Sequence, residues 1–292
     1  MPALHDPTAV PPSLMRVRLD LGYDGGGFSG WAYQPGQRTV EGELSEGLAT
    51  VLRVPLDAVR LTVAGRTDAG VHATGQVAHV DVPPASWAAL PGRSTCAPGE
   101  SMVRRLGGVL PHDVRVHRAE PAPEGFDARF SALRRRYAYR VSDDPAGVPP
   151  LRRHDVLDHR RRLDLDAMNE ATAAMTGLKD FAAFCRRREG ATTVRTLLEY
   201  SWHRDEQGLA VATVVADAFC HSMVRSLVGV LLPVGEGRRP PSWPAQILGS
   251  RQRNGAGDVV APHGLVLEEV VYPDDDGLAQ RAREARATRS LT

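Results

Sequence analysis

The chain has 292 residues, of which 42% are hydrophobic, and its basic and acidic residues nearly cancel to a formal net charge of +1. This length supports one large domain or two modest ones with buried cores, and no apolar run reaches the roughly 18–20 residues that a membrane-spanning helix needs. The composition therefore argues against a membrane protein and against a chain that is basic over its whole surface.

The start of the chain, MPALHDPTAVPPSL, is rich in proline and lacks the basic and apolar regions of a signal peptide. We expect residues 1–14 to be a disordered leader and the protein to be cytoplasmic. The cysteines are odd in number and show no CxxC spacing, which fits a reducing compartment and argues against a disulfide framework or a zinc site. They are Cys96, Cys185 and Cys220.

The first part of the chain predicts a strand, a helix, a strand–turn–strand unit, a helix and a strand. In the first strand, Val17, Leu19 and Leu21 alternate with charged residues, as in a half-buried strand. Thr39 is a suitable cap for the first helix, whose apolar face comprises Val40, Leu44, Leu48, Val51 and Leu52. The elements are expected at 15–25, 39–54, 61–82, 99–110 and 113–123.

The second part repeats this order. Gly177 is a candidate end for its first helix. The repetition predicts an α+β fold of two similar ferredoxin-like or RRM-like β-α-β-β-α-β halves with antiparallel sheets. The expected elements are at 134–143, 163–177, 196–219, 221–235 and 264–273. We expect an N-terminal subdomain at 15–132, a C-terminal subdomain at 133–273 and an Ala/Arg-rich tail at 274–292.

Arginine is used almost everywhere in place of lysine, since Lys179 is the single lysine. GC-rich coding bias is one explanation. Arginine forks nevertheless bind phosphates and stack on bases, and clustered arginines in a chain of balanced charge suggest a local polyanion-binding face. The clusters are Arg104–Arg105, Arg134–Arg136, Arg152–Arg153, Arg160–Arg162 and Arg186–Arg188.

The stretch AGRTDAGVHATGQVAHVDV places Asp68 among glycines, a threonine and Arg66, just before a strand. Its carboxylate has four possible roles: to shape a turn, bind a metal, pair with Arg66, or act as a nucleophile. His72 lies four residues on, but no third metal ligand is nearby. No GxSxG elbow, P-loop or GxGxxG motif is present.

This stretch resembles the signature of the TruA family of tRNA pseudouridine synthases. YDGGGFSGWAYQPGQRTVEGELSEGL, LPHDVRV, FDARFSALRRRYAYRV, FAAFC, ADAFCHSMVRSLVGVLLPVG and APHGLVLEEVVYP resemble further blocks of the family in the same order. The resemblance covers about residues 15–273. It implies two α+β halves that flank a basic cleft, a homodimer, and conversion of uridine to pseudouridine at nucleotides 38, 39 and 40 in the anticodon stem-loop of tRNA, with no cofactor and no metal.

The resemblance also implies roles for particular residues. Asp68 matches the nucleophilic aspartate, Tyr137 the tyrosine that packs on the target base, and Arg225 the arginine that pairs with the aspartate. We expect Arg66 to fill the space of the flipped nucleotide or hold its phosphate. We expect His221, one turn before Arg225, to be a structural or RNA-contacting residue.

Two readings from other classes stay open beside the enzyme. One is a catalytically idle RNA-binding module, against which the presence of Asp68, Tyr137 and Arg225 argues. The other is a metal-dependent hydrolase, which a chelator would inactivate. We expect the Arg134–Arg136 run to lie on the rim of the cleft and grip phosphates.

The sequence departs from the family pattern in two places. The connection around Ser94–Ser101 is longer than expected. Asp217 stands where many members have Asn, which puts the hydrogen bonding near Arg225 in doubt.

Overall fold

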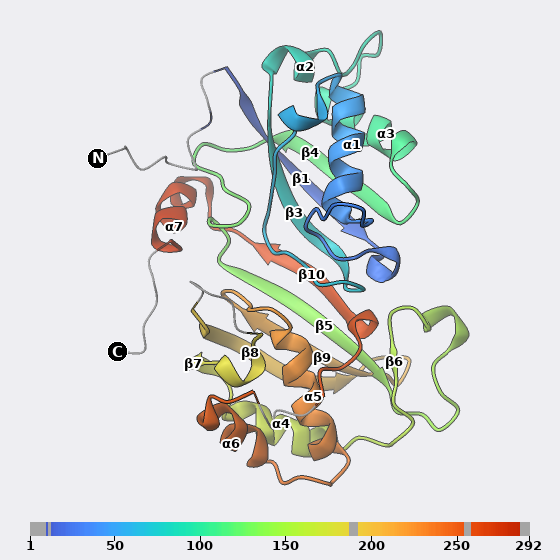
Figure 1. The fold of residues 1–292 in the computed structure, drawn as a ribbon, viewed down its shortest axis with the longest axis vertical. Coiled ribbons are helices and arrows are strands. Elements are labelled where there is room, and N and C mark those ends of the chain that lie inside the picture. Colours follow the sequence, from blue (N-terminus) through green and yellow to red (C-terminus); the bar gives the residue numbers. More distant parts are fainter. Residues whose placement is uncertain (1–9, 11–12, 187–191, 254–257, 287–292) are drawn as a thin grey trace. The chain divides into compact units, whose positions relative to one another are not determined.

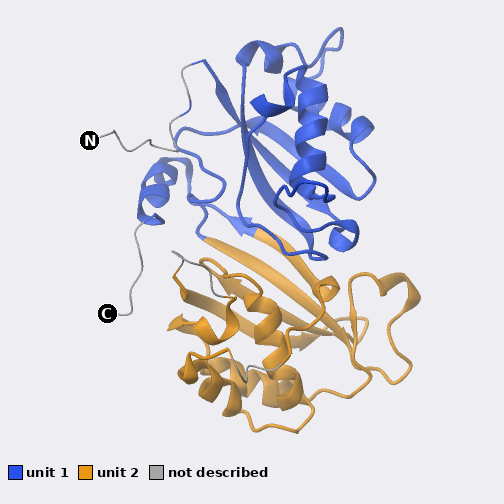
Figure 2. Ribbon diagram, in the orientation of Figure 1, with its two compact units in different colours: residues 1–133, 270–287 blue, residues 134–269, 288–292 orange. Residues whose placement is uncertain are grey.

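The computed structural model describes residues 10, 13–186, 192–253 and 258–286. The chain divides into two compact units: of the described residues, those up to 133 and those at 270–286 belong to unit 1, and those within 134–269 belong to unit 2 (Figure 2). Each unit combines helices with mostly antiparallel strands, so the predicted α+β class is confirmed (Figure 1).

The sheet of unit 1 is built on β1 (Met15–Tyr23), which pairs antiparallel with both β3 (His72–Val82) and β4 (Val114–Pro121). β2 (Leu61–Val63) pairs antiparallel with β3. The alternation predicted for the first strand is confirmed, because Val17, Leu19 and Leu21 are all 0% exposed. Each such side chain contributes roughly 1.5–3 kcal/mol through burial.

The longest helix of unit 1 is α1 (Val40–Leu52), and it begins as the sequence predicts. The Thr39 hydroxyl accepts a hydrogen bond from the Gly42 amide at 3.2 Å, which satisfies one of the free amides of the first turn. The apolar face of the helix is buried. The other helices described in this unit are α2 (Pro84–Ala88), α3 (Pro98–Val109) and α7 (Leu278–Glu284).

The strands of unit 2 follow the order β5, β9, β8, β7, and successive neighbours run antiparallel. Their bounds are β5 (Arg134–Ser142), β7 (Gly177–Asp180), β8 (Val194–Arg204) and β9 (Ala210–Ala216). The short β6 (Leu157–Asp158) pairs parallel with β5. Residues 265–269 of β10 (Leu265–Val271) lie beside β5 in the same unit.

The central helix of unit 2 is α5 (Met223–Gly235), which is buried along nearly its whole length. α4 (Leu165–Ala173) is capped by Asp164, whose Oδ1 accepts from the Ala167 amide at 3.0 Å. α6 (Trp243–Ser250) follows α5. Across both units the described 3-10 turns are η1 (Gly25–Gly27), η2 (Leu56–Ala58), η3 (Pro150–Arg152), η4 (Ala182–Phe184), η5 (Pro262–Gly264) and η6 (Asp275–Gly277).

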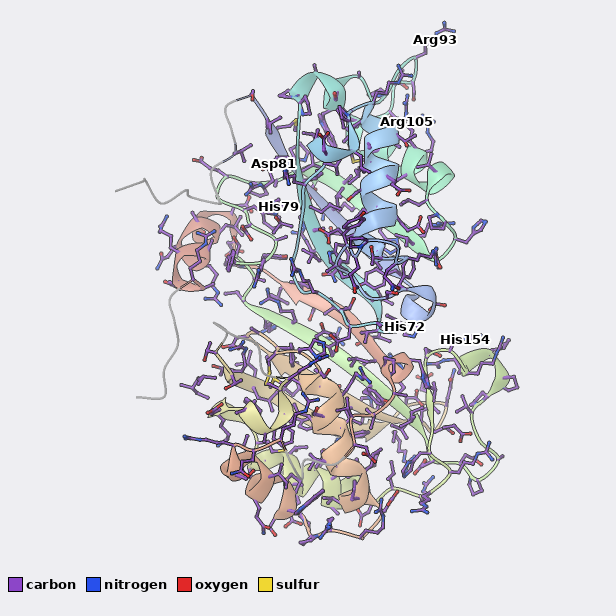
Figure 3. All side chains as sticks on the ribbon, in the orientation of Figure 1. His72, His79, Asp81, Arg93, Arg105 and His154 are labelled. Carbon is purple, nitrogen blue, oxygen red and sulfur yellow. A yellow bond between two sulfur atoms is a disulfide. The ribbon has the colours of Figure 1, made fainter. Side chains whose placement is uncertain are left out.

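The helix predicted over 163–177 is shorter than expected. It ends at Ala173, and Gly177 opens β7 with a φ of +99° instead of closing the helix. The connection around Ser94–Ser101 is a loop only to Ala97, because α3 begins at Pro98. Arg93 extends from the tip of this connection (Figure 3).

The protein contains one disulfide that the cysteine pattern did not predict. Cys185 and Cys220 form a disulfide, with Cα atoms 5.6 Å apart and a separation of 35 positions in sequence. The two segments are neighbours because the Arg186 amide donates to the His221 carbonyl at 3.2 Å. Local cysteine spacing cannot reveal such a contact.

The two ends of the chain are only partly described. Of the predicted leader, residues 1–9 and 11–12 lie outside the described residues, as do residues 287–292 of the predicted tail. The described part of the tail contains α7. Among the described helices, none is both long enough and apolar enough to cross a membrane.

Candidate active site

Asp68 lies in unit 1, in the loop of residues 64–71 between β2 and β3. Neighbouring side chains differ sharply in burial: Thr67 is only 6% exposed, whereas Arg66 is exposed and Asp68 is half-buried. The Val71 amide donates to the Asp68 carbonyl at 3.2 Å, which closes a tight turn. The loop therefore directs Thr67 inward and leaves Arg66 and Asp68 accessible.

The segment after β1 holds this loop through its backbone. The Trp31 amide donates to the Thr67 carbonyl at 3.0 Å, and the Gly70 amide donates to the Phe28 carbonyl at 3.3 Å. Between these bonds lies Gly30, with a φ of +101°. A Cβ at Gly30 would lie 3.0 Å from the Thr67 carbonyl oxygen, so this approach requires glycine.

A buried polar network supports the inner side of the loop. The Tyr23 and Thr67 hydroxyls are 2.8 Å apart. Gln76 Nε2 donates to the Tyr23 hydroxyl at 3.0 Å and to the Gly65 carbonyl at 2.8 Å. Burial raises the pKa of Tyr23 from 10.0 to about 12, against the opposing effect of its hydrogen bonds, so this phenol stays protonated near neutral pH.

His72, at the end of the loop, contributes to its structure. The His72 side chain is 8% exposed, and Nδ1 accepts from the Gly25 amide at 3.0 Å while lying 3.0 Å from Asp24 Oδ1 (Figure 3). Within the described part of the chain, no three His, Cys, Asp or Glu side chains gather as a metal site. His72 therefore anchors the start of β3 to η1.

Tyr137 lies in unit 2, on β5, and is 7% exposed. Its ring meets the Phe219 ring edge to face, with centroids 5.0 Å apart and planes at 85°. This contact fixes the orientation of the tyrosine ring. Stacking of Tyr137 on a uracil stays a prediction.

Arg225 lies on α5 and is half-buried, and its Nε donates to the Val260 carbonyl at 2.7 Å. One turn further along α5, a Cβ at Gly229 would lie 2.0 Å from the Asp258 carbonyl oxygen. The helix face that carries Arg225 is therefore packed closely against residues 258–260. Its predicted pairing with Asp68 stays a prediction, since the two residues belong to different units.

Arg225 also affects a neighbouring phenol in unit 2. Burial raises the pKa of Tyr139 above its usual range, and the positive charge of Arg225 acts in the opposite direction. The Tyr139 hydroxyl donates to the Ala261 carbonyl at 2.8 Å. The segment after residue 257 thus contacts both β5 and α5.

His221 precedes α5 and is exposed, with its Nδ1 2.8 Å from the Ser222 hydroxyl. Its exposure leaves the predicted RNA contact open. The Asp217 carboxylate accepts from the Thr196 amide at 3.2 Å, and the Asp217 carbonyl accepts from Arg135 at 2.7 Å. These contacts bind the β9–α5 connection to β8 and β5.

One of the three arginines of the expected rim is buried, and the rim stays a prediction for the other two. Arg135 is 7% exposed. Arg136 pairs with Glu268 and Glu269 on β10. The sequence pattern missed these pairs because the acids lie 132 and 133 residues away. Arg134 is the one exposed member of the run.

Tyr23, Gln76 and Gly30 were not predicted as site residues, although the sequence carries a signal for the first two. Tyr23 shares the alternation of the inward residues of its strand, and Gln76 has the same parity as Ala78 and Val80. Gln76 is 0% exposed. A polar side chain that points to the same buried face as apolar neighbours requires hydrogen bonds inside the protein. The position of Gln76 in the strand pattern therefore predicts a buried polar contact.

Known proteins resemble the chain over nearly its whole length. A family model described as tRNA pseudouridine synthase matches residues 171–273. A protein named tRNA pseudouridine synthase A from Streptomyces griseus is 60% identical over 281 residues, which cover 96% of each chain. Its namesake from Mycobacterium leprae is 50% identical over 286 residues, covering 96% of this chain and 98% of the relative. The chain therefore belongs to the tRNA pseudouridine synthase A (TruA) family of isomerases.

Proposed function

We propose that this protein converts uridine to pseudouridine at nucleotides 38, 39 and 40 in the anticodon stem-loop of tRNA, with Asp68 as the nucleophile and without a cofactor. The observation that carries the proposal is the accessible carboxylate on a loop whose backbone and inner side are both hydrogen-bonded. A fixed carboxylate of this kind suits covalent catalysis.

The reaction rearranges one nucleotide without any net addition. The N1–C1′ bond of uridine breaks, the base turns over, and C5 joins C1′. C5 loses a proton and N1 gains one, so that product and substrate are isomers. Asp68 attacks the sugar or the base, or assists departure of the uracil.

The other predicted residues have defined roles in this proposal. The Tyr137 ring packs on the freed uracil while it turns. Arg225 pairs with Asp68 and orients its carboxylate. Arg66, which is exposed beside Asp68, holds the flipped nucleotide or its phosphate, and His221 contacts RNA. We further propose that the two units are the two similar halves of the family fold, and that the protein is a cytoplasmic homodimer.

The decisive experiment incubates unmodified tRNA with the purified protein and maps pseudouridine at each position. The wild type should modify positions 38–40. Asp68→Asn should lower the rate by more than about 10⁴-fold while binding of tRNA persists. Asp57→Asn, which changes an exposed carboxylate on η2 of the same unit, is the matched control and should keep the wild-type rate.

Two results would contradict the proposal. Measurable turnover by Asp68→Asn would exclude Asp68 as the nucleophile. Tight binding of tRNA by the wild type without any pseudouridine would favour an RNA-binding module.

A further inference from the structure

We infer that Tyr23 and Gln76 are positioning residues for Asp68, acting on it through the buried side chain of Thr67. This inference rests on the proposed function, because it assigns a role to residues that support the proposed nucleophile. All three side chains are buried, with Tyr23 and Thr67 each 6% exposed and Gln76 0% exposed, and the inference assigns none of them a contact with substrate.

The Gln76 amide nitrogen donates two of the hydrogen bonds of the network. The Gly65 carbonyl can only accept, so the Gln76 amide nitrogen must face it, at 2.8 Å. The same nitrogen uses its second proton toward the Tyr23 oxygen at 3.0 Å. The Tyr23 and Thr67 hydroxyls lie 2.8 Å apart, and either one can be the donor of the bond that joins them. These hydrogen bonds link Gln76 on β3, through Tyr23 on β1, to Thr67, the residue before Asp68.

The network holds the loop at two points on either side of Arg66. Gln76 binds the backbone at Gly65, and Tyr23 binds the side chain of Thr67. Since Thr67 is also held through its carbonyl by the Trp31 amide, its backbone and its side chain are both fixed. The direction of the next residue, Asp68, is thereby set.

The position of the network argues for a role beyond stability. Gln76 lies opposite Leu21 in the sheet and in phase with Ala78, both of which are 0% exposed. Apolar side chains at the positions of Tyr23, Thr67 and Gln76 would also stabilise the sheet, and they would avoid the free-energy cost of burying polar groups. A fully bonded polar network instead selects one arrangement of the chain, here that of the loop that carries the nucleophile.

The test compares two substitutions at Thr67 that differ in the hydroxyl. Thr67→Val keeps the volume and removes the hydroxyl, and Thr67→Ser keeps the hydroxyl. The measurement is the single-turnover rate of pseudouridine formation with enzyme in excess over tRNA, per folded molecule as determined by circular dichroism. Thr67→Val should lose up to about 100-fold, the cost of a misplacement of about 1 Å, and Thr67→Ser should recover most of the rate. The Kd for tRNA should change by less than about threefold in both, because the substituted side chain is buried.

Tyr23→Phe gives a second, independent test, since it keeps the ring and removes only the hydroxyl. It should reduce the rate at least as much as Thr67→Val does, because it also removes the acceptor of the Gln76 bond. The double variant should lose no more than the more severe single variant, since both changes break the same Tyr23–Thr67 bond. Tyr272→Phe is the matched control: it removes a phenol that donates to the Ala128 carbonyl at 2.7 Å in the same unit, and it should keep the wild-type rate.

The possible failures are distinguishable. If the wild type forms no pseudouridine, the proposed function fails and this inference falls with it. If the wild type turns over and both Thr67→Val and Tyr23→Phe stay within about threefold of its rate per folded molecule, only this inference is overturned. A loss that Thr67→Ser does not recover, or fully multiplicative losses in the double variant, would also overturn it.

Discussion

Gly30→Ala should impair catalysis more than its effect on stability explains. At a φ of +101° an alanine is strained, at a cost of about 1–3 kcal/mol of unfolding free energy. The new Cβ would also lie 3.0 Å from the Thr67 carbonyl oxygen, 3.2 Å from the Ala69 amide nitrogen and 3.3 Å from the Asp68 carbonyl carbon. These neighbours are backbone atoms, so the loop itself must move by a few tenths of an ångström.

The displacement sets the expected loss of rate. If about 1 Å of misplacement costs about 100-fold, a few tenths of an ångström at Asp68 should cost about 5- to 10-fold in kcat. The assay is single-turnover pseudouridine formation per folded molecule, with thermal unfolding measured in parallel. The Kd for tRNA should change little, because the new methyl group contacts the backbone of the loop and not the exposed side chains that would bind RNA.

A matched glycine separates strain from displacement. Gly208, in the β8–β9 turn, has a φ of +79°, and a Cβ there would meet no atom within 4 Å. Gly208→Ala should therefore lower stability and leave the rate unchanged. The reasoning is refuted if Gly30→Ala keeps the wild-type rate per folded molecule, or if both variants lose the same fraction of it.

Two further predictions concern stability. Burial lowers the pKa of His79 from 6.5 to about 4, and its Nδ1 accepts from the Ala128 amide at 3.0 Å. As the pH falls, the unfolded chain therefore takes up a proton at this histidine before the folded chain does. The contribution of His79 to the unfolding free energy should be fully present above pH 6.5, and the unfolding free energy should fall by up to about 3 kcal/mol toward pH 4. Urea unfolding at pH 7 and pH 4.5 measures the loss, and His79→Gln should flatten it. Asp143→Ala should cost about 3–5 kcal/mol by leaving Arg204 without its buried partner, whereas Asp158→Ala, at an exposed pair, should change unfolding by less than about 1 kcal/mol.

Local sequence patterns predicted the elements that have a recognisable cap or a regular alternation of buried and exposed residues. The strand of Val17, Leu19 and Leu21 and the helix capped by Thr39 were predicted because period and cap are written in adjacent residues. β7 was missed because it has four residues and is defined by pairing with β8. A strand this short shows no clear alternation, so only its partner identifies it.

For the candidate site too, the sequence predicted what depends on neighbouring residues and not what depends on contacts between distant ones. The motif around Asp68 identified the loop and the family, but the support of the loop depends on residues far away in sequence. Tyr23 lies 44 residues before Thr67, and Gln76 lies 53 residues after Tyr23. Their parity indicates that both point inward, yet only the folded chain determines that their hydroxyl and amide groups meet.

The arginine clusters show why sequence charge does not translate directly into a phosphate-binding face. Within the Arg134–Arg136 run, Arg136 is neutralised by Glu268 and Glu269 from β10. Arg134 is exposed and has no ion-pair partner among the described residues. Counterion release is produced by charges that contact phosphate, at a slope of about −0.9 per contact for duplex and −0.7 for single strands in log affinity against log salt.

The members of the run should therefore differ in binding. Arg134→Gln should flatten the salt slope of tRNA binding by about 0.7–0.9 if this guanidinium contacts one phosphate. Arg136→Gln should leave the slope unchanged and lower the unfolding free energy instead, because Glu268 on β10 loses one of its arginine partners. Filter binding of tRNA from 50 to 200 mM salt measures the slopes, and urea unfolding measures the stabilities. Equal slopes for the two variants, both flatter than that of the wild type, would mean that the Glu268 and Glu269 pairs open when tRNA binds and that Arg136 contacts phosphate after all.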